Sequence, residues 1–339
     1  METDLFGHDI PPPPADLKGV DALFAYAPSF RRCDRFRDML RFAAAARDLA
    51  PYNAMMVHLQ KPDARHVLPA ASWLRYNRVP KPDARPAVVL WPFQPVQYWF
   101  DIGDTDVIPD QPDLFPPELA RLPDGEPQTE PSEELRDALG ANLPLWGIAR
   151  KPVAAAPDFA GALSTDVVGQ PRLRIPVDAA GAIVKWPPCY TLSIRRTATP
   201  AEEVSVIVHE LARLFCGHLP SAYPEHAWEW RRDLPQETRD FEVETVAWLV
   251  FHRRSLRDDR STAFLADYLA THAAIPTVAI DALMGAVGSI EQMFRRRSVV
   301  SGLLYKNSAE FRDAVSGVRE PRPGHAEPKP PVQLMMPWG

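Results

Sequence analysis

The sequence predicts an α+β protein, in which a small N-terminal α+β domain is followed by a mainly helical domain with a short β-sheet. Two observations lead to this fold class. Apolar residues recur at helical spacing over long stretches concentrated in the second half, and short β-prone runs lie between turn signals in both halves. The length of 339 residues fits about two domains, each with enough apolar sequence for a core.

Proline-rich stretches mark the expected boundaries of these domains. The two ends of the chain are rich in proline, and a segment of this kind buries too little surface to order itself. We expect a disordered tail at 1–20, a first domain at 21–108, an acidic proline-rich linker at 109–140, a second domain at 141–315 and a proline-rich tail at 316–339.

The first domain is expected to begin with a helix over residues 30–49, where apolar side chains repeat every three or four positions. Pro51 ends this helix. A short apolar run, a helical turn with Ser72 as its cap and two strands are expected to follow. These segments are 53–59, 72–76, 87–91 and 97–100.

The best-marked element of the second domain is a helix with Thr199 as its N-cap. Pro200 occupies the first helical position and Glu202 completes a capping box, while Gly217 is expected to close the helix after Cys216. Strands are expected before this helix and further helices after it. The strands are 172–176, 182–186 and 190–195, and the helices are 235–251, 261–272 and 278–297.

The net charge of −6 is unevenly distributed along the chain. Residues 101–140 contain twelve acidic and two basic side chains, so the rest of the chain is net positive and a nucleic-acid partner is not excluded. We expect the acidic segment to be a solvated spacer. The alternative is that it folds over the basic half and mimics DNA.

The composition indicates a cytoplasmic protein that does not enter a membrane. The chain has no uncharged apolar run of about 18 residues, and its N-terminus is acidic rather than basic and then apolar. The three cysteines form no C-x-x-C pair, which fits a reducing compartment.

The helix that begins at Thr199 contains the sequence His209-Glu210-Leu211-Ala212-Arg213. In a His-Glu-x-x-His helix, two histidines four residues apart hold one zinc ion, and the glutamate between them acts as general base on the bound water. Here the second position is Arg213, which has no lone pair to donate to a metal.

Two explanations of Arg213 remain open on the sequence alone. A substitute ligand could complete the zinc site, with His218 the first candidate beside Cys216 and His226. Alternatively, the guanidinium of Arg213 could face Glu244 and replace the charge of the metal by an ion pair.

The second half resembles the ImmA/IrrE-like metallopeptidase domain over residues 208–218 and 241–250. The resemblance implies a zincin-like fold in which His209 and Glu244 hold zinc and Glu210 is the catalytic residue. The spacing alone leaves open whether Glu242 or Glu244 faces the first helix.

The first half resembles the ArdC-type N-terminal domain, a single-stranded-DNA-binding module of antirestriction proteins, over about residues 30–106. The matching segments include 52–62, 88–90 and 100–105, and the pairing with a metallopeptidase-like half is also that of ArdC. The resemblance implies single-stranded DNA as a partner and a role in antirestriction or mobile elements.

The composition of the first half agrees with this implication, because binders of single strands combine basic side chains for phosphates with aromatic rings for bases. Trp73 and Tyr98 are among the aromatic residues of this half. The residues expected to contact DNA are Arg31, Arg35, Arg41, Asn53, Trp73, Arg78 and Lys81.

The sequence therefore supports two functions, which differ in what the second half of the chain does. In one, an ArdC-like single-stranded-DNA-binding protein carries a zinc metallopeptidase, with His209, Glu244 and His218 as ligands and Glu210 as catalytic residue acting on a protein or peptide substrate. In the other, the peptidase-like half is a degenerate, metal-free scaffold that binds a protein partner.

Overall fold

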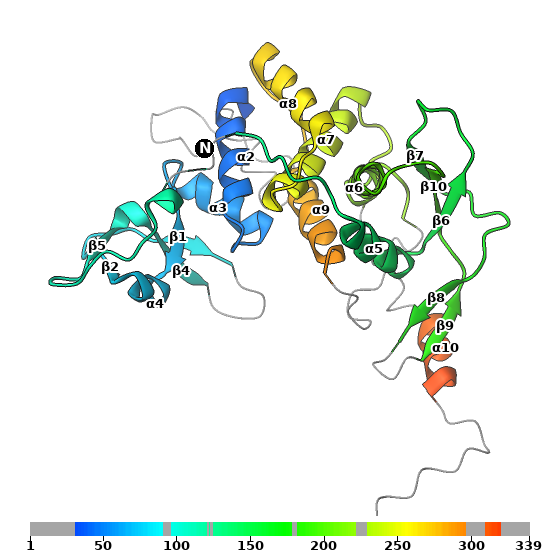
Figure 1. Cartoon of the computed structure of the whole chain (residues 1–339), viewed down its shortest axis with the longest axis horizontal. Helices are drawn as coiled ribbons and strands as arrows, with labels where there is room; N and C mark the ends of the chain where they lie inside the picture. Colours follow the sequence, from blue (N-terminus) through cyan, green and yellow to red (C-terminus); the bar gives the residue numbers. More distant parts are fainter. Residues whose placement is uncertain are drawn as a thin grey trace, which may run out of the picture.

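The computed structural model describes residues 31–90, 96–120, 122, 125–177, 182–221, 229–295 and 309–319. The expected tail at 1–20 lies outside the described residues, and so does most of the expected tail at 316–339. Figure 1 shows a small sheet unit, a central group of helices and a second sheet region side by side. Helices and small sheets occur together, which confirms the α+β class predicted from the sequence.

The described helices and strands follow one another along the whole chain. The α-helices are α2 (Cys33–Ala45), α3 (Pro51–Gln60), α4 (Ala70–Trp73), α5 (Glu133–Asn142), α6 (Pro200–Phe215), α7 (Gln236–Arg253), α8 (Asp259–Thr271), α9 (Ile280–Met293) and α10 (Ala309–Arg319). The strands are β1 (Val67–Pro69), β2 (Arg78–Pro80), β3 (Ala87–Val89), β4 (Gln97–Asp101), β5 (Thr105–Val107), β6 (Ile148–Val153), β7 (Gly161–Ser164), β8 (Leu173–Pro176), β9 (Ile183–Trp186) and β10 (Tyr190–Arg195). Among these described helices, none is long and apolar enough to cross a membrane.

The small unit is built on an antiparallel sheet with the strand order β1-β4-β3. Side chains alternate across a strand, so Trp99 of β4 lies on one face of the sheet and Tyr98 and Phe100 lie on the other. Trp99 is buried in the main core, which it shares with Val67 of β1. Strands β2 and β5 form a separate antiparallel pair beside this sheet.

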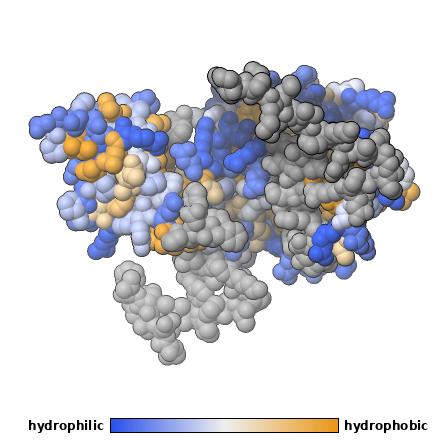
Figure 2. Space-filling model, turned by 90° about the horizontal axis from the view of Figure 1, so that it is seen from below, coloured by the Kyte–Doolittle hydropathy of each residue, from blue (hydrophilic) through white to orange (hydrophobic). Residues whose placement is uncertain are grey.

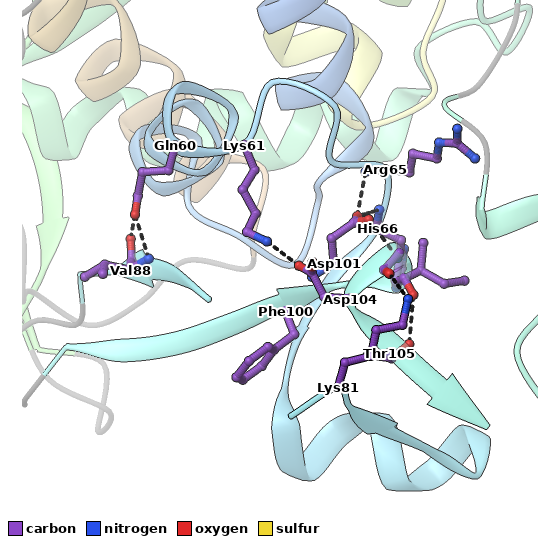
Figure 3. A network of polar contacts seen from close by, with 12 residues as sticks. Gln60, Lys61, Arg65, His66, Lys81, Val88, Phe100, Asp101, Asp104 and Thr105 are labelled. Atoms are coloured by element: carbon purple, nitrogen blue, oxygen red, sulfur yellow. Dashed lines mark hydrogen bonds and ion pairs between the residues drawn. The ribbon is translucent and has the colours of Figure 1, made fainter. Parts of the chain in front are cut away.

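Two amide side chains of α3 bind the outer edge of β3. Asn53 donates to the carbonyl of Leu90 over 2.8 Å and accepts from its N–H over 3.2 Å. Gln60 makes the same pair of bonds with Val88, at 3.0 Å and 2.8 Å, as Figure 3 shows. The two amides are seven residues apart, or about two helical turns, so α3 takes the place of a neighbouring strand.

A carboxylate at the end of β4 holds the turn between α3 and β1. Asp101 accepts from the backbone N–H groups of Arg65 at 2.7 Å and of His66 at 3.0 Å, and its other oxygen accepts from Gly103 at 2.9 Å. Lys61 forms an ion pair with Asp104 in the same network (Figure 3). This end of the unit is therefore a structural polar network.

The helices of both halves of the chain share one hydrophobic core. Phe36 of α2 lies against Phe241 of α7 with their ring centroids 5.6 Å apart. Arg253 at the end of α7 is buried, and its guanidinium donates to the carbonyl oxygens of Ala43, Ala46 and Leu49 at the end of α2. The main core thus contains residues from both sides of the expected domain boundary, and a smaller cluster around Trp73 lies outside it.

The described residues of the expected linker at 109–140 contact the helices and include the start of α5. Thr129 forms a parallel bridge with Leu256, and its carbonyl accepts from the N–H of Arg257 over 2.8 Å. Glu126 of the same segment lies 2.5 Å from Nε2 of His252. Figure 1 shows the coloured part of this stretch passing from beside α2 across α7 to α5.

The second sheet has the order β6-β10-β7, with β10 parallel to β6 and antiparallel to β7. Helix α6 follows β10 directly and packs close to β7, where a Cβ at Gly161 would lie 2.5 Å from Val206. The hairpin β8–β9 extends from this region and packs against α10.

The described elements match the sequence-based expectations unevenly. The helix that begins at Thr199 is confirmed, with both capping-box bonds and Gly217 in a left-handed conformation at its end. The helix expected over 30–49 ends at Ala45, and Ser72 lies inside α4 instead of capping it. Strands β6 and β7 were not expected.

Candidate functional site

His209 of α6 and Glu244 of α7 lie together between the two helices. Nε2 of His209 is 3.1 Å from a carboxylate oxygen of Glu244, and both residues are buried. Nδ1 of His209 is 2.7 Å from the carbonyl oxygen of Ser205, one helical turn earlier. Because a carbonyl oxygen only accepts, Nδ1 carries a hydrogen, and Nε2 is the nitrogen presented to Glu244.

Helix α8 contributes two more side chains to Glu244. Ser261 donates to one carboxylate oxygen over 2.7 Å, and Arg260 donates to the other over 2.8 Å. Burial alone would raise the pKa of Glu244, but the bond and charge of His209, the Ser261 hydroxyl and the charge of Arg260 lower its pKa to about 2. Glu244 is therefore an ionised carboxylate held by three donors.

Arg213 lies against Glu210 and does not provide the ion pair to Glu244. Its guanidinium donates to Glu210 over 2.7 Å, and the same carboxylate oxygen accepts from the backbone N–H of Leu163 in β7 over 3.0 Å. The hypothesis that Arg213 faces Glu244 is thus corrected, because Arg260 occupies that place. Glu210, the candidate catalytic residue, is joined to an edge strand and to an arginine.

His218 belongs to a different cluster. Its Nε2 lies 2.8 Å from Glu242, which also receives two bonds from Arg231 at 2.7 and 2.8 Å and one from the N–H of Ala279 at 3.0 Å. Residues two apart on a helix point in nearly opposite directions, so Glu242 and Glu244 face different neighbours. The structure thus joins His209 to Glu244 and joins His218 to Glu242.

The polar groups around Glu242 hold its carboxylate with several bonds, although Nδ1 of His218 is buried without a hydrogen-bond partner among the residues that the structure describes. Burial would raise the pKa of Glu242, but the bonds from His218 and Arg231 outweigh it and lower the pKa. Burial also raises the pKa of the adjacent Cys216 thiol well above its usual range, so the sulfur is protonated and uncharged beside Glu242.

The zinc site implied by the resemblance is half complete in the part of the chain that the structure describes. His209 is oriented as a zinc ligand usually is, with its second nitrogen bonded to a carbonyl, and Glu244 faces it. A zinc site takes three or four protein ligands. Among the described residues, no group of three or more His, Cys, Asp or Glu side chains lies close enough together to hold a metal, and the candidate His226 is outside them.

The residues expected to contact DNA are dispersed, and several make structural bonds. Asn53 binds the edge of β3, and Trp73 is fully buried with its indole N–H bonded to the carbonyl of Phe100 at 3.0 Å. Arg78 pairs with Asp113 at 2.6 Å.

The remaining four lie at the surface or in contacts between elements. Lys81 donates to the carbonyl of Gly103 over 2.8 Å, and Arg31 donates to that of Ile275 over 3.2 Å. Arg35 and Arg41 are exposed on α2.

An aromatic surface lies on the small sheet. Of its two rings, Tyr98 was among the aromatic candidates expected from the sequence, whereas Phe100 was not placed beside it. Pro69, Ala70, Pro86, Val96, Gln97, Tyr98 and Phe100 line a shallow open depression, which we call the aromatic face. Tyr98 is 57% exposed, and Phe100 is supported from below by the cluster around Trp73. The alternation in Gln97-Tyr98-Trp99-Phe100 was the available signal, because it separates Tyr98 and Phe100 from the buried Trp99.

Comparison with known proteins finds no matching family model, no similar curated protein and no similar solved structure.

Proposed function

We propose that this protein binds single-stranded DNA through the aromatic face of its small sheet. The observation that carries the proposal is the placement of Tyr98 and Phe100 two residues apart on the central strand, on the face turned away from the core. Such rings are about 7 Å apart along a strand, and aromatic side chains on an open sheet are stacking platforms for unpaired bases. The resemblance to the ArdC-type domain supports the same function.

The surroundings of the aromatic face suit an extended, negatively charged strand. Figure 2 shows apolar residues at the surface of this unit among hydrophilic ones. Arg85 is exposed and directly precedes Pro86 of the face, and Figure 3 shows the ring of Phe100 pointing away from the helix that carries Lys61. Base stacking together with a nearby guanidinium is the usual combination for binding without sequence preference.

Fluorescence anisotropy with a labelled oligothymidine tests this proposal on the full chain. Tyr98→Ala should weaken binding by roughly five- to a hundredfold, because stacking on one base contributes about 1–3 kcal/mol. Arg85→Gln should reduce the salt dependence of the dissociation constant. Trp230→Ala is the matched control, since Trp230 is a 47% exposed aromatic residue in the other half of the chain.

Two results would contradict the DNA-binding proposal. One is the absence of salt-sensitive binding to the oligonucleotide at low ionic strength. The other is an equal loss of affinity in Tyr98→Ala and Trp230→Ala, which would place the contact elsewhere or show it to be nonspecific.

We further propose that the peptidase-like half is a metal-free scaffold for a protein partner. The observation that favours it is the set of bonds on Glu244, where Arg260, Ser261 and His209 supply the positive charge and the donors that a bound cation would otherwise supply. Glu210 is likewise paired with Arg213. A zinc peptidase, with Glu210 as general base and a further ligand beside His209 and Glu244, is the alternative.

Metal content measured by mass spectrometry separates these two functions. The wild type and Arg213→His should be purified without chelators or a histidine tag. The scaffold predicts zinc in Arg213→His alone, because that substitution restores the second histidine one turn after His209. About one zinc per wild-type chain would overturn the scaffold and favour the peptidase.

A further inference from the structure

A cavity of about 440 Å³ lies between α2, α7 and α8, and residues 125–127 of the crossing segment form part of its wall. We call it the α2–α8 cavity. Its volume falls in the range of about 300–1,000 Å³ that is typical of small-molecule sites. It is separate from the His209–Glu244 pair and from the aromatic face, since it shares no lining residue with either.

The lining combines an apolar body with positive charge. The apolar surface comes from α2, α7 and α8 and includes Leu40, Ala44, Trp248, Leu265, Ala266 and Leu269. Three arginines, Arg37, Arg41 and Arg47, also line the cavity, and the acidic residue among its lining residues is Glu126. Among the described lining residues, the arginines thus outnumber the acidic residue by three to one.

Two of these arginines are fixed in place by bonds to the opposite helices. Arg37 donates to the carbonyl of Leu269 on α8 over 2.8 Å. Arg47 donates to the hydroxyl of Ser255, beyond the end of α7, over 2.7 Å. A guanidinium has five N–H donors, so a side chain held by one or two bonds can still donate to a ligand.

The acidic residue of the lining is engaged within the protein. Glu126 lies 2.5 Å from Nε2 of His252, whose ring stacks on Trp248 with centroids 3.8 Å apart. Thr262 adds a second contact to the same carboxylate oxygen at 3.4 Å. The carboxylate of Glu126 thus already has hydrogen-bond partners within the protein.

We propose that the α2–α8 cavity binds a small organic anion with an apolar body, such as a carboxylate or sulfonate on an aliphatic or aromatic group. The apolar body would lie against Leu265, Leu269 and Trp248. The anionic group would lie at the guanidinium groups of Arg37 and Arg41, each of which has more N–H donors than one or two bonds use. Helix positions 37 and 41 are one turn apart and face the same way, so Arg37 adds to the positive potential there. The assignment also gives Arg41 a role other than contact with DNA.

The first experiment titrates the full chain with 8-anilinonaphthalene-1-sulfonate, a fluorescent anion with an apolar body. We expect saturable binding that Ala266→Trp abolishes, because the new indole fills the cavity. Ala263→Trp is the matched control, since Ala263 is exposed on the same helix but does not line the cavity. Equal binding by the two tryptophan variants would overturn the proposal.

The second experiment tests the charge and does not depend on filling the cavity. Arg41→Gln should weaken binding of the probe about tenfold, as expected for loss of a charged hydrogen bond. Arg35→Gln, which removes an exposed arginine of α2 outside the cavity, should leave it unchanged. Octanoate should displace the probe and octan-1-ol should not, and equal displacement by both would overturn the recognition of an anion.

Discussion

At the scale of single residues, Glu244 of α7 shows how one buried carboxylate is stabilised by neighbours from two other helices. Its carboxylate oxygens receive bonds from α6 through His209 and from α8 through Arg260 and Ser261. Removing Glu244 from this set leaves the buried side chains of His209 and Ser261 without their partner, which costs more than the set contributes as a whole. The residue is therefore a sensitive point for stability whether or not a metal binds.

We predict that the stabilisation by Glu244 disappears in acid. The pKa of Glu244 is about 2 in the folded chain, against 4.5 as its ordinary value. Because the folded pKa is depressed, the contribution is complete above about pH 4.5 and is lost as the pH falls towards 2. Glu244→Gln should lower the free energy of unfolding by about 3 kcal/mol at pH 7 and by much less at pH 3.

Urea unfolding at both pH values measures this difference. Glu134→Gln is the control, since Glu134 is an exposed carboxylate at the start of α5. A loss of stability in Glu244→Gln that is equal at pH 7 and pH 3 would contradict the assignment of the ionised form.

We predict that Asn53 acts on stability and not on DNA binding. Its amide satisfies both backbone groups of Leu90, so Asn53→Ala should cost about 1–3 kcal/mol in urea unfolding. The affinity for oligothymidine should stay within about twofold, because base stacking belongs to the aromatic face. Gln111→Ala is the control, since Gln111 is an exposed amide residue. A large loss of affinity in an Asn53→Ala variant that remains stable would instead mean that Asn53 contacts DNA.

At the scale of elements, the end of α6 depends on a glycine for two separate reasons. Gly217 has a φ of +76°, which L-residues rarely adopt, and an added Cβ would lie 2.3 Å from the carbonyl oxygen of Glu229. Gly169 has a similar φ of +74° but open space around it. Comparing substitutions at Gly217 and Gly169 therefore separates the cost of backbone strain from the cost of a steric clash.

We predict that Gly169→Ala destabilises the chain by about 1–2 kcal/mol, the cost of the left-handed conformation alone. Gly217→Ala should cost clearly more, because the backbone at Glu229 must also move. Thermal and urea unfolding of both variants measure the cost of the left-handed backbone and the added cost of the contact with Glu229. Equal costs would show that the contact with Glu229 yields easily.

The signals that predicted elements from the sequence were local ones. Thr199 and Glu202 are three residues apart, and their capping box fixed the start of α6 correctly. Strand β6 was missed because Arg150, Lys151 and Pro152 interrupt its apolar pattern, and its partner β10 begins about forty residues later. Elements held by distant pairing leave little trace in a short window of sequence.

The candidate site was predictable to a similar extent. The motif placed His209 and Glu210 on one helix, and the resemblance selected Glu244 as the facing residue, in agreement with the contact observed. The side chains that complete the set, Arg260 and Ser261, come from a helix that carries no motif. Their contact with Glu244 depends on how α8 packs against α7, which spacing alone does not specify.

At the scale of the whole molecule, the two halves expected from the sequence fold around one core. Buried Arg253 bonds three carbonyl oxygens at the end of α2 and also pairs with Glu291 of α9 at 2.7 Å. Arg47 and Arg37 of the first half likewise donate to the ends of α7 and α8. These contacts predict that α2 and α3 unfold together with the helices of the second half.

We predict a single cooperative unfolding transition. Arg253→Met should lower the free energy of unfolding by about 3–5 kcal/mol, because methionine leaves the carbonyl oxygens of α2 and the carboxylate of Glu291 without their donor. Arg254→Met is the matched control. Arg254 is the next residue along the chain, it is exposed, and its guanidinium lies 4.5 Å from the centroid of the Phe294 ring. Hydrogen exchange during urea unfolding should show amides of α2 and α7 losing protection at the same urea concentration. Earlier loss of protection in α2 alone would mean that the first half unfolds as an independent domain in spite of the shared core. The domain boundary expected from the sequence would then be correct.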